Sequence, residues 1–412
     1  MLGNVNITSL KFTYFFLFFF FLAANNAAHS FFEDIEFEGE LSLSGRYFPS
    51  APEYSGQKHN NLSMALKPEF FTNFEEHGSL VFTPFIRLDN TDPNRSKIDF
   101  REFLYTNYGN DWEASIGIGQ IFWGVTESKN LVDIVNQFDE VDDPFYQTKL
   151  GQPLGNITLI RDEGYFEFYI LPYFRERPRP GKKGRLRTDP HFLKRNAKFE
   201  GGSQWTPEFA FRWLNTYEDI DISTHAFLGY AREPSIDLRI IDGITNYGAA
   251  YQRIRQLGGT LQKTTGATLY KLELITRDGQ RDSSGKITEF LASVFGFEHT
   301  LYRVLGDQED LALILEYNFD SRRDKSSDLL QDDLFIATRF SFNDSKNSEI
   351  FVSSFFDLDG DGQTYQFDLG RRINDSLTGT IRGAIYQNGR PSSTIYILRQ
   401  DSWLELELKY YF

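Results

Sequence analysis

Strict alternation of side-chain type is the feature that most restricts the fold of this chain. In IEFEGELSLSGRY, the odd positions from Ile35 to Tyr47 are apolar or glycine, and the even positions are polar or charged. A period of two is that of a β-strand, whereas a helix would spread the glutamates around its axis. The segment 35–47 is therefore predicted to be a strand with one apolar and one polar face.

The same pattern recurs along the chain, with alternating or aromatic-rich segments separated by clusters of turn-forming residues. It predicts about 18 strands, with 16 as the alternative, and no long helix or linker between domains. The predicted strands are 35–47, 61–73, 79–89, 97–108, 111–123, 156–162, 164–174, 205–217, 220–231, 249–263, 266–277, 287–302, 309–319, 333–343, 349–359, 363–373, 376–387 and 402–412.

The connections between these strands alternate between short and long. Short ones include YGND (108–111) and IND (373–375). Longer polar ones lie between them, at 48–60, 124–155, 175–204, 232–248 and 388–401. Short turns at one end and long loops at the other predict an antiparallel up-and-down meander.

The first 30 residues differ from the rest. Lys11 precedes FTYFFLFFFFLAA, an uncharged apolar run that is too short to cross a bilayer as a helix, which needs about 20 residues. A positive residue, a short apolar core and small residues at Ala28 and Ser30 are typical of a secretory signal. We expect 1–30 to be a signal peptide, with an N-terminal membrane anchor as the alternative, and 31–412 to be one exported domain.

Composition decides which all-β architecture fits this domain. Aromatic residues make up 16% of a chain whose mean hydropathy is negative, so large rings need a non-aqueous place. A propeller should show a repeat of roughly 40 residues, which we do not find. Polar faces such as the one carrying Lys271 and Glu273 fit a wet interior, and the aromatic faces fit a lipid exterior. The pattern predicts a transmembrane β-barrel, and a secreted β-sandwich is the alternative.

The C-terminal segment points to the same class. In WLELELKYYF, Leu404, Leu406, Leu408, Tyr410 and Phe412 share one face, and the other face is largely charged. This segment resembles the insertion signal of Gram-negative outer-membrane barrels, which end on Phe with alternating apolar residues before it. Leu408, Tyr410 and Phe412 correspond to that signal.

Residues 98–124 also resemble a segment of porin-like outer-membrane proteins, which runs Arg-Glu-x-x-Tyr, an acidic-Trp turn and Gly-x-Gln-x-x-Trp-Gly. The matching positions are Arg101, Glu102, Tyr105, Asp111, Trp112, Gly117 or Gly119, Gln120, Trp123 and Gly124. The resemblance covers about forty residues plus the C-terminus. It implies the outer membrane of a Gram-negative bacterium, contact with lipid and lipopolysaccharide, and assembly by the barrel-assembly machinery.

Alternation also assigns residues to the lumen, although a register error of one residue would turn any of them outward. The principal pore-lining candidates are Arg101, Glu113, Arg212, Arg253, Lys271, Glu273, Arg339 and Arg372. Glu38, Arg46, Arg87, Asp368 and Glu405 are expected on the same inner face.

Two long connections carry opposite charge. The connection 124–155 is acidic, and its middle, NLVDIVNQF, has apolar residues at near-helical spacing. The connection 175–204 is basic. In porins a comparable long loop folds into the barrel, and opposed acidic and basic walls would orient polar solutes across a constriction. Alternatively, both are solvated loops and the basic one contacts lipopolysaccharide.

The segment DLDGDGQTYQFD places Asp357, Asp359 and Asp361 at the first, third and fifth positions of a calcium loop. Both flanks have strand patterns, and Asp-Gly favours hairpin turns. A plain turn and a loop-bound divalent cation such as Ca²⁺ are therefore both open here, and no other cofactor is expected.

The net charge of −15 argues against nucleic acid as a partner, and the histidines, including His225, form no hydrolase signature, so no enzyme activity is expected. We expect a porin-like channel for passive diffusion of small polar solutes. The alternative is a non-conducting barrel that serves adhesion or envelope structure. The sequence leaves homo-oligomerisation open.

Overall fold

The structure is a computed structural model that describes residues 35–74, 78–145, 147–193, 197–326, 328, 330–391 and 393–412. The expected signal peptide, 1–30, lies outside these residues. None of the helices in the described ranges is long and apolar enough to cross a membrane.

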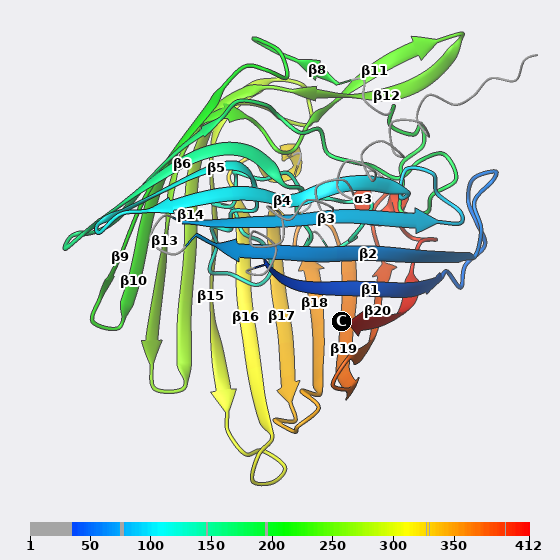
Figure 1. Ribbon diagram of the computed structural model, residues 1–412. Coiled ribbons are helices and arrows are strands. Elements are labelled where there is room, and N and C mark those ends of the chain that lie inside the picture. Colours follow the sequence, from blue (N-terminus) through cyan, green and yellow to red (C-terminus); the bar gives the residue numbers. More distant parts are fainter. Residues whose placement is uncertain are drawn as a thin grey trace, which may run out of the picture.

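Eighteen antiparallel strands form one sheet that closes on itself, because β1 pairs with both β2 and β21 (Figure 1). The barrel strands are β1 (Ile35–Tyr47), β2 (Asn60–Asn73), β3 (Ser79–Asp89), β4 (Lys97–Tyr108), β5 (Trp112–Gly119), β6 (Gln152–Arg161), β7 (Gly164–Leu171), β9 (Glu208–Tyr217), β10 (Ile220–Tyr230), β13 (Arg253–Thr265), β14 (Thr268–Arg281), β15 (Ile287–Leu301), β16 (Asp310–Asp320), β17 (Asp332–Ser341), β18 (Glu349–Asp357), β19 (Gln363–Asn374), β20 (Leu377–Gln387) and β21 (Trp403–Tyr411). The predicted strand number and fold class are confirmed.

A second, three-stranded sheet lies over the end of the barrel that carries the long loops, and contains β8 (Lys198–Phe199), β11 (Ser235–Ile241) and β12 (Ile244–Tyr251). Two short helical segments, η1 (Arg323–Lys325) and α3 (Thr394–Ile397), also occur in connections. The prediction of 232–248 as a plain loop is wrong, because β11 and β12 form a hairpin there. Asp242 and Gly243 both have positive φ, 51° and 75°, as the favoured two-residue hairpin turn requires.

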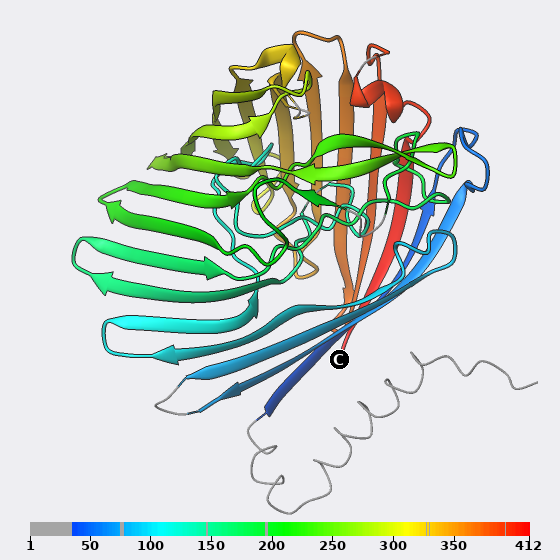
Figure 2. The same ribbon diagram turned by 90° about the horizontal axis from the view of Figure 1, so that it is seen from above.

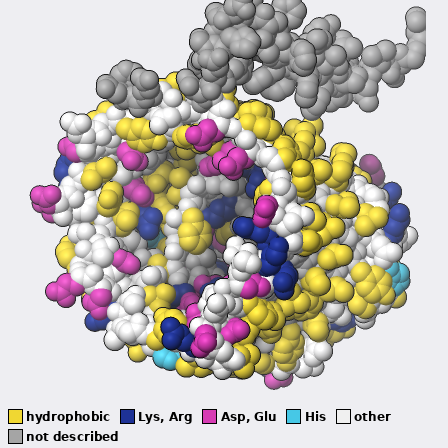
Figure 3. Space-filling model, turned by 60° about the horizontal axis from the view of Figure 1, so that its bottom comes forward, with side chains coloured by type: hydrophobic (Ala, Val, Ile, Leu, Met, Phe, Trp, Pro, Cys, Tyr) yellow, Lys and Arg dark blue, Asp and Glu magenta, His cyan; other side chains and the backbone are white. Residues whose placement is uncertain are grey.

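Side chains on the two faces of the barrel strands meet different surroundings. Large apolar residues on the outer face stay exposed, for example Leu43 at 56%, Ile116 at 67% and Leu406 at 53%. Their inward neighbours, such as Ser44 and Glu405, are buried. Hydrophobic side chains accordingly crowd the outer wall in Figure 3. A closed barrel leaves no strand edge unpaired, so this apolar surface can face lipid.

The two terminal strands, β1 and β21, pair with each other and close the barrel. Residue pairs run from Glu40↔Tyr411 to Tyr47↔Leu404. Beyond them, the Gly39 N–H donates to the Phe412 carbonyl oxygen at 2.8 Å, and the Phe412 N–H donates to the Gly39 carbonyl oxygen at 3.0 Å. The Phe412 ring covers Gly39, where a Cβ would lie 2.3 Å from it. Glycine at this position therefore makes room for the terminal ring.

Deletion of Phe412 should reduce the amount of folded barrel in the membrane severalfold, because it removes both hydrogen bonds to Gly39 and uncovers the edge of β1. The measurement is the heat-sensitive fraction of the protein on an unheated SDS gel of outer membranes. Phe412→Tyr, which keeps the ring and the backbone, is the control and should assemble normally. Wild-type levels of the deletion variant would contradict the insertion role.

Candidate functional site

The barrel interior is crossed by the two long connections that differ in charge. Figure 2 shows them as coil inside the ring of strands. The acidic one, residues 120–151, follows β5, and the basic one, residues 172–207, follows β7. The alternative in which both are solvated loops is therefore wrong. Of the two alternatives left open by the sequence, the one in which 124–155 folds into the barrel is correct.

The acidic loop is held to the wall of β3 and β4 by cations. The Arg101 guanidinium donates to Asp139 Oδ2 at 2.9 Å and to Asp142 Oδ2 at 3.1 Å. Asp142 Oδ1 lies 2.6 Å from Arg87 Nε, and Asp139 lies 2.5 Å from Lys97 Nζ. Asp139 is fully buried and Asp142 nearly so. These carboxylates are therefore neutralised by the barrel wall.

The same loop reaches the wall of β20, β21 and β1. Asp143 lies 3.7 Å from Arg382, which also pairs with Glu405 at 2.9 Å. Glu405 in turn pairs with Arg46 at 2.8 Å. The loop thus joins a network of buried charges that links the first and last strands of the barrel.

On the opposite wall the contacts are of another kind. Two inward glutamates, Glu273 of β14 and Glu316 of β16, accept hydrogen bonds from the loop backbone at 2.8–3.3 Å. The donors are the N–H groups of Val125, Thr126 and Val132 for Glu273, and of Glu127 and Ser128 for Glu316. These backbone N–H groups belong to no helix or strand in the loop. The two glutamate carboxylates therefore accept the hydrogen bonds that a helix or sheet would otherwise provide.

Apolar packing supports these polar anchors. Side chains of the loop form one buried cluster with the inner wall of β6, β7, β9, β10 and β13 to β15. The loop contributes Trp123, Leu131, Val132, Ile134 and Val135. The near-helical spacing of apolar residues in NLVDIVNQF therefore marks a buried face, although the segment forms no helix.

The basic loop lies beside the acidic one and also reaches the wall. Arg175 pairs with Asp99 of β4 at 2.8 Å, and Arg185 Nε pairs with Asp401, just before β21, at 2.5 Å. These arginines therefore hold the loop against the wall and are not free charges facing an open pore.

The two loops touch each other as well. Arg179 of the basic loop lies 3.9 Å from Glu140 of the acidic loop, and the Arg177 Nε donates to Gln137 Oε1 at 2.9 Å. At this point the acidic and basic loops are in direct contact, and opposed walls across an open constriction stay a prediction.

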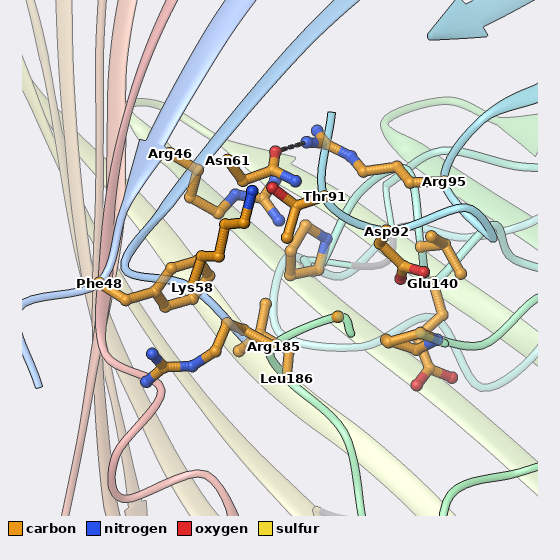
Figure 4. A pocket seen from close by; sticks show the side chains of 14 residues that line it. Arg46, Phe48, Lys58, Asn61, Thr91, Asp92, Arg95, Glu140, Arg185 and Leu186 are labelled. Carbon is orange, nitrogen blue, oxygen red and sulfur yellow. Dashed lines mark hydrogen bonds between the residues drawn. The ribbon is translucent and has the colours of Figure 1, made fainter. Parts of the chain in front are cut away.

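A small cavity remains between these loops and the inner wall of β1 and β2 (Figure 4). Its volume is about 30 Å³, room for about two water molecules. Arg46, Lys58, Arg95 and Arg185 line it together with Asp92 and Glu140. The cavity is too small for a solute, so its lining residues serve as contacts between the loops and the barrel wall.

The principal pore-lining candidates fall on the inner face with one exception. Lys271 and Arg339 lie together, since both contact Glu298, at 3.1 and 3.4 Å, and Arg212 lies 3.9 Å from Glu167. The inward candidates are Arg101, Glu113, Arg212, Lys271, Glu273, Arg339 and Arg372, of which Arg372 lies at the rim near the β19–β20 turn.

Arg253 is the exception, and its assignment to the lumen is wrong. Farther along the same strand, Gln256 is buried opposite Phe227 and Arg277, whereas the next residue, Leu257, is 59% exposed. Arg253 therefore shares the outward parity of Leu257. The sequence misleads because two arginines and two leucines occupy the same face of this strand, and an outward charge is tolerated near a strand end.

Several anchoring residues were not predicted. The inward position of Glu316 could have been predicted from LALILEYNFD. There Leu311, Leu313 and Leu315 share one face, and Glu316 lies on the other. Arg95, which pairs with Asp89 and Glu405, lies in a connection without periodicity. Only the folded chain reveals it.

The aspartates of the calcium-like segment lie in a hairpin turn between β18 and β19. The Asp357 N–H donates to the Gly362 carbonyl oxygen at 2.9 Å, and Asp357 Oδ1 accepts from the Asp359 N–H at 3.1 Å. Asp361 has φ of 61°, as in a tight turn. Across the described residues no group of three His, Cys, Asp or Glu side chains is placed to hold a metal.

The insertion-signal residues lie on the outer face as predicted. Leu408, Tyr410 and Phe412 are 37%, 48% and 47% exposed. Tyr410 and Phe412 stack with ring centres 6.1 Å apart. This face therefore contributes to the lipid-facing surface.

The barrel is similar in fold to several solved outer-membrane proteins. OccK11 (OpdR) of Pseudomonas aeruginosa matches with a TM-score of 0.55 and 10% identity, over 92% of this chain and 96% of that one. OccK3 (OpdO) of the same species gives 0.54 and 11%, over 92% and 96%. OccAB3 of Acinetobacter baumannii gives 0.53 and 11%, over 92% and 99%. The fold is that of an outer-membrane β-barrel.

No family model matches the chain, and no curated protein matches it in sequence. The structural likeness at this identity concerns the fold. Together with the apolar outer wall, this fold places the chain in the outer membrane of a Gram-negative bacterium.

The Asp142 carboxylate, which anchors the acidic loop to the β3–β4 wall, predicts how the anchoring of this loop depends on pH. Burial acts to raise the pKa of Asp142, but Arg87, Lys97 and Arg101 outweigh it and hold the pKa well below its usual value of 3.8. A carboxylate with a depressed pKa stabilises the fold above its unfolded pKa, and this stabilisation is lost as the pH falls through the folded pKa. We expect the loop anchor to persist from pH 8 to about pH 4 and to weaken only below that.

The measurement is channel conductance as a function of pH for wild type and Asp142→Asn. A transition between pH 7 and pH 5 that disappears in Asp142→Asn would contradict this assignment. A transition confined to strongly acidic solution would agree with it.

Proposed function

We propose that this protein is a channel for passive diffusion of small polar solutes across the outer membrane. The observation that carries the proposal is the fixed position of residues 120–151 inside the lumen, anchored at both walls. Such a loop narrows a barrel of this size without a moving part. Seen toward the turn end, the molecule is hollowed, with charged side chains around the opening (Figure 3).

The charged side chains of the inner wall favour the passage of polar solutes. Lys271, Arg339 and Glu298 line one side of the interior, and Arg212 and Glu167 another. Rings of charged side chains exclude apolar solutes and orient polar ones. Because most inner cations are paired with carboxylates, the size of the solute should matter more than the sign of its charge.

The proposal is non-enzymatic. Among the described residues, His225 is the one histidine with a lumen-facing position in a strand. Its ring lies against the Trp123 ring at 5.4 Å, and its Nε2 lies 2.9 Å from Gln256 Nε2. These contacts give it a packing role between wall and loop.

Planar-bilayer recording on refolded protein tests the function. We expect discrete single-channel steps, and a reversal potential close to zero in a salt gradient. Absence of steps from protein whose barrel is intact by its heat-sensitive gel mobility would refute the channel.

One observation favours the second candidate, a non-conducting barrel with an envelope-structural or adhesive role. The apolar cluster around Trp123 and Val135 fills part of the lumen as a packed core. The same recording decides between the two, since a structural barrel would give no steps. Assembly by the barrel-assembly machinery, export by residues 1–30 and association into homo-oligomers remain proposals alongside either function.

A further inference from the structure

The outer wall of the barrel carries a groove with two arginines, near the end where the long loops emerge. It lies across β9, β10, β13 and β14 and has a volume of about 500 Å³. Phe209, Leu228, Ile254 and Gly279 line it together with Arg253, Arg255 and Asp278. This groove is outside the lumen and does not depend on whether the barrel conducts.

The register shows that the arginines point away from the lumen. Gln256 lies opposite Phe227 and Arg277 in neighbouring strands, and all three are buried inside. Arg255 lies opposite Leu228 and Asp278 and is exposed. Two residues apart on one face, Arg253 and Arg255 are roughly 7 Å from each other along the strand.

Both guanidinium groups have donors to spare. Arg253 donates to the Pro207 carbonyl oxygen at 3.2 Å and lies over the Tyr230 ring at 5.2 Å. Within the part of the chain that the structure describes, no carboxylate lies within 4 Å of the Arg255 guanidinium, although Asp278 is its partner in register. Two arginines on a lipid-facing wall with no carboxylate paired to them among the described residues can therefore bind an anion from outside the chain.

The surroundings place this pair at the boundary between headgroups and acyl chains. Leu257 and Leu261 continue the same face of β13 toward the middle of the barrel and are 59% and 36% exposed. On the other side, the turn at 201–207 lies beside Arg253 and carries Trp205, which is 70% exposed. Tryptophan is enriched at membrane interfaces, and outward charges are costly at the bilayer centre.

We propose that this groove binds a phosphorylated, multiply acylated glycolipid of the outer leaflet, the lipid A portion of lipopolysaccharide. Arg253 and Arg255 would hold a phosphate, since guanidinium groups bind phosphate oxygens in pairs. The acyl chains would lie along Phe209, Leu228 and Leu257. In outer-membrane barrels the longer loops are extracellular, so a groove at the long-loop end opens to the leaflet that contains this lipid.

The test uses refolded full-length protein in detergent with EDTA, titrated with hexa-acylated lipid A, its dephosphorylated form or phosphatidylglycerol, and analysed by native mass spectrometry. We expect lipid A to bind wild type at least about tenfold more tightly than either other lipid, which corresponds to about 1.4 kcal/mol. This comparison needs no variant. Equal binding of the dephosphorylated form or of phosphatidylglycerol would overturn the proposal.

Variants localise the site. Arg253→Gln/Arg255→Gln should lose the preference for lipid A. The matched control is Arg161→Gln/Arg371→Gln, which removes two exposed arginines at the turn end and should keep the preference. Asp278→Asn should bind lipid A as tightly as wild type or more tightly, because a negative charge at the groove is removed. Retained preference in the first double variant, or weaker binding by Asp278→Asn, would refute the assignment.

Discussion

Replacing Asp139 and Asp142 together by asparagine should widen the channel and enlarge the neutral solutes it admits. The two substitutions leave Arg87, Lys97 and Arg101 without their main carboxylate partners at a buried wall. Breaking one buried pair by removing a partner costs about 3–5 kcal/mol. We expect the loop to leave the β3–β4 wall, because its other anchors cannot offset this loss there.

Liposome swelling with neutral sugars of increasing size is the measurement, since it does not respond to the change in lumen charge. The control is Asp111→Asn, whose partner Arg161 lies at an exposed turn and is worth little. It should leave the size limit unchanged. An unchanged size limit in the Asp139→Asn/Asp142→Asn variant, with the barrel intact, would mean that the loop is held without these pairs.

Replacing Glu273 and Glu316 together by glutamine should release the other side of the loop. Each glutamate uses both of its carboxylate oxygens to accept backbone N–H groups between Val125 and Val132. Glutamine presents one amide NH₂ where an oxygen was, so a donor meets a donor. A hydrogen bond to a charged group contributes about 1.5–3 kcal/mol, so amide exchange there should rise roughly ten- to hundredfold.

Hydrogen exchange of the peptide that covers 121–134, followed by mass spectrometry, measures this directly. The control is Glu113→Gln, because Glu113 also lies on the inner face of the barrel, in β5. This substitution should leave exchange in 121–134 as in wild type. Equal protection in the double variant would show that the apolar cluster around Val135 alone fixes the loop. Exchange in this peptide reports the order of the loop and not the width of the channel.

Much of the barrel could be predicted from local pattern. The terminal pair, 35–47 and 402–412, shows why: each strand alternates strictly, and a slip of one residue would turn its apolar face into the lumen. The observed pairing, from Glu40↔Tyr411 to Tyr47↔Leu404, keeps both apolar faces outside. Strand β13 is less clear from its pattern, because its outward face mixes Arg253 and Arg255 with Leu257 and the polar face cannot be told from the apolar one.

The site could be predicted only in part. The charge of the two long connections was visible, as was the inward position of Arg101 and Glu273. Their partners were not, because Arg101 meets Asp139 and Asp142 across about forty residues of chain, and Glu273 meets backbone groups that carry no sequence signal. Arg95 likewise lies in a connection without periodicity.

The sequence by itself determined the strands, the faces of most of them, the closed barrel and its place in the membrane, because each follows from side chains repeating at a period of two against lipid and water. Only the tertiary structure decided what the loops do inside the lumen and which arginines remain for an external anion. Loop position depends on ion pairs and backbone hydrogen bonds between distant segments, and no local repeat encodes such partners.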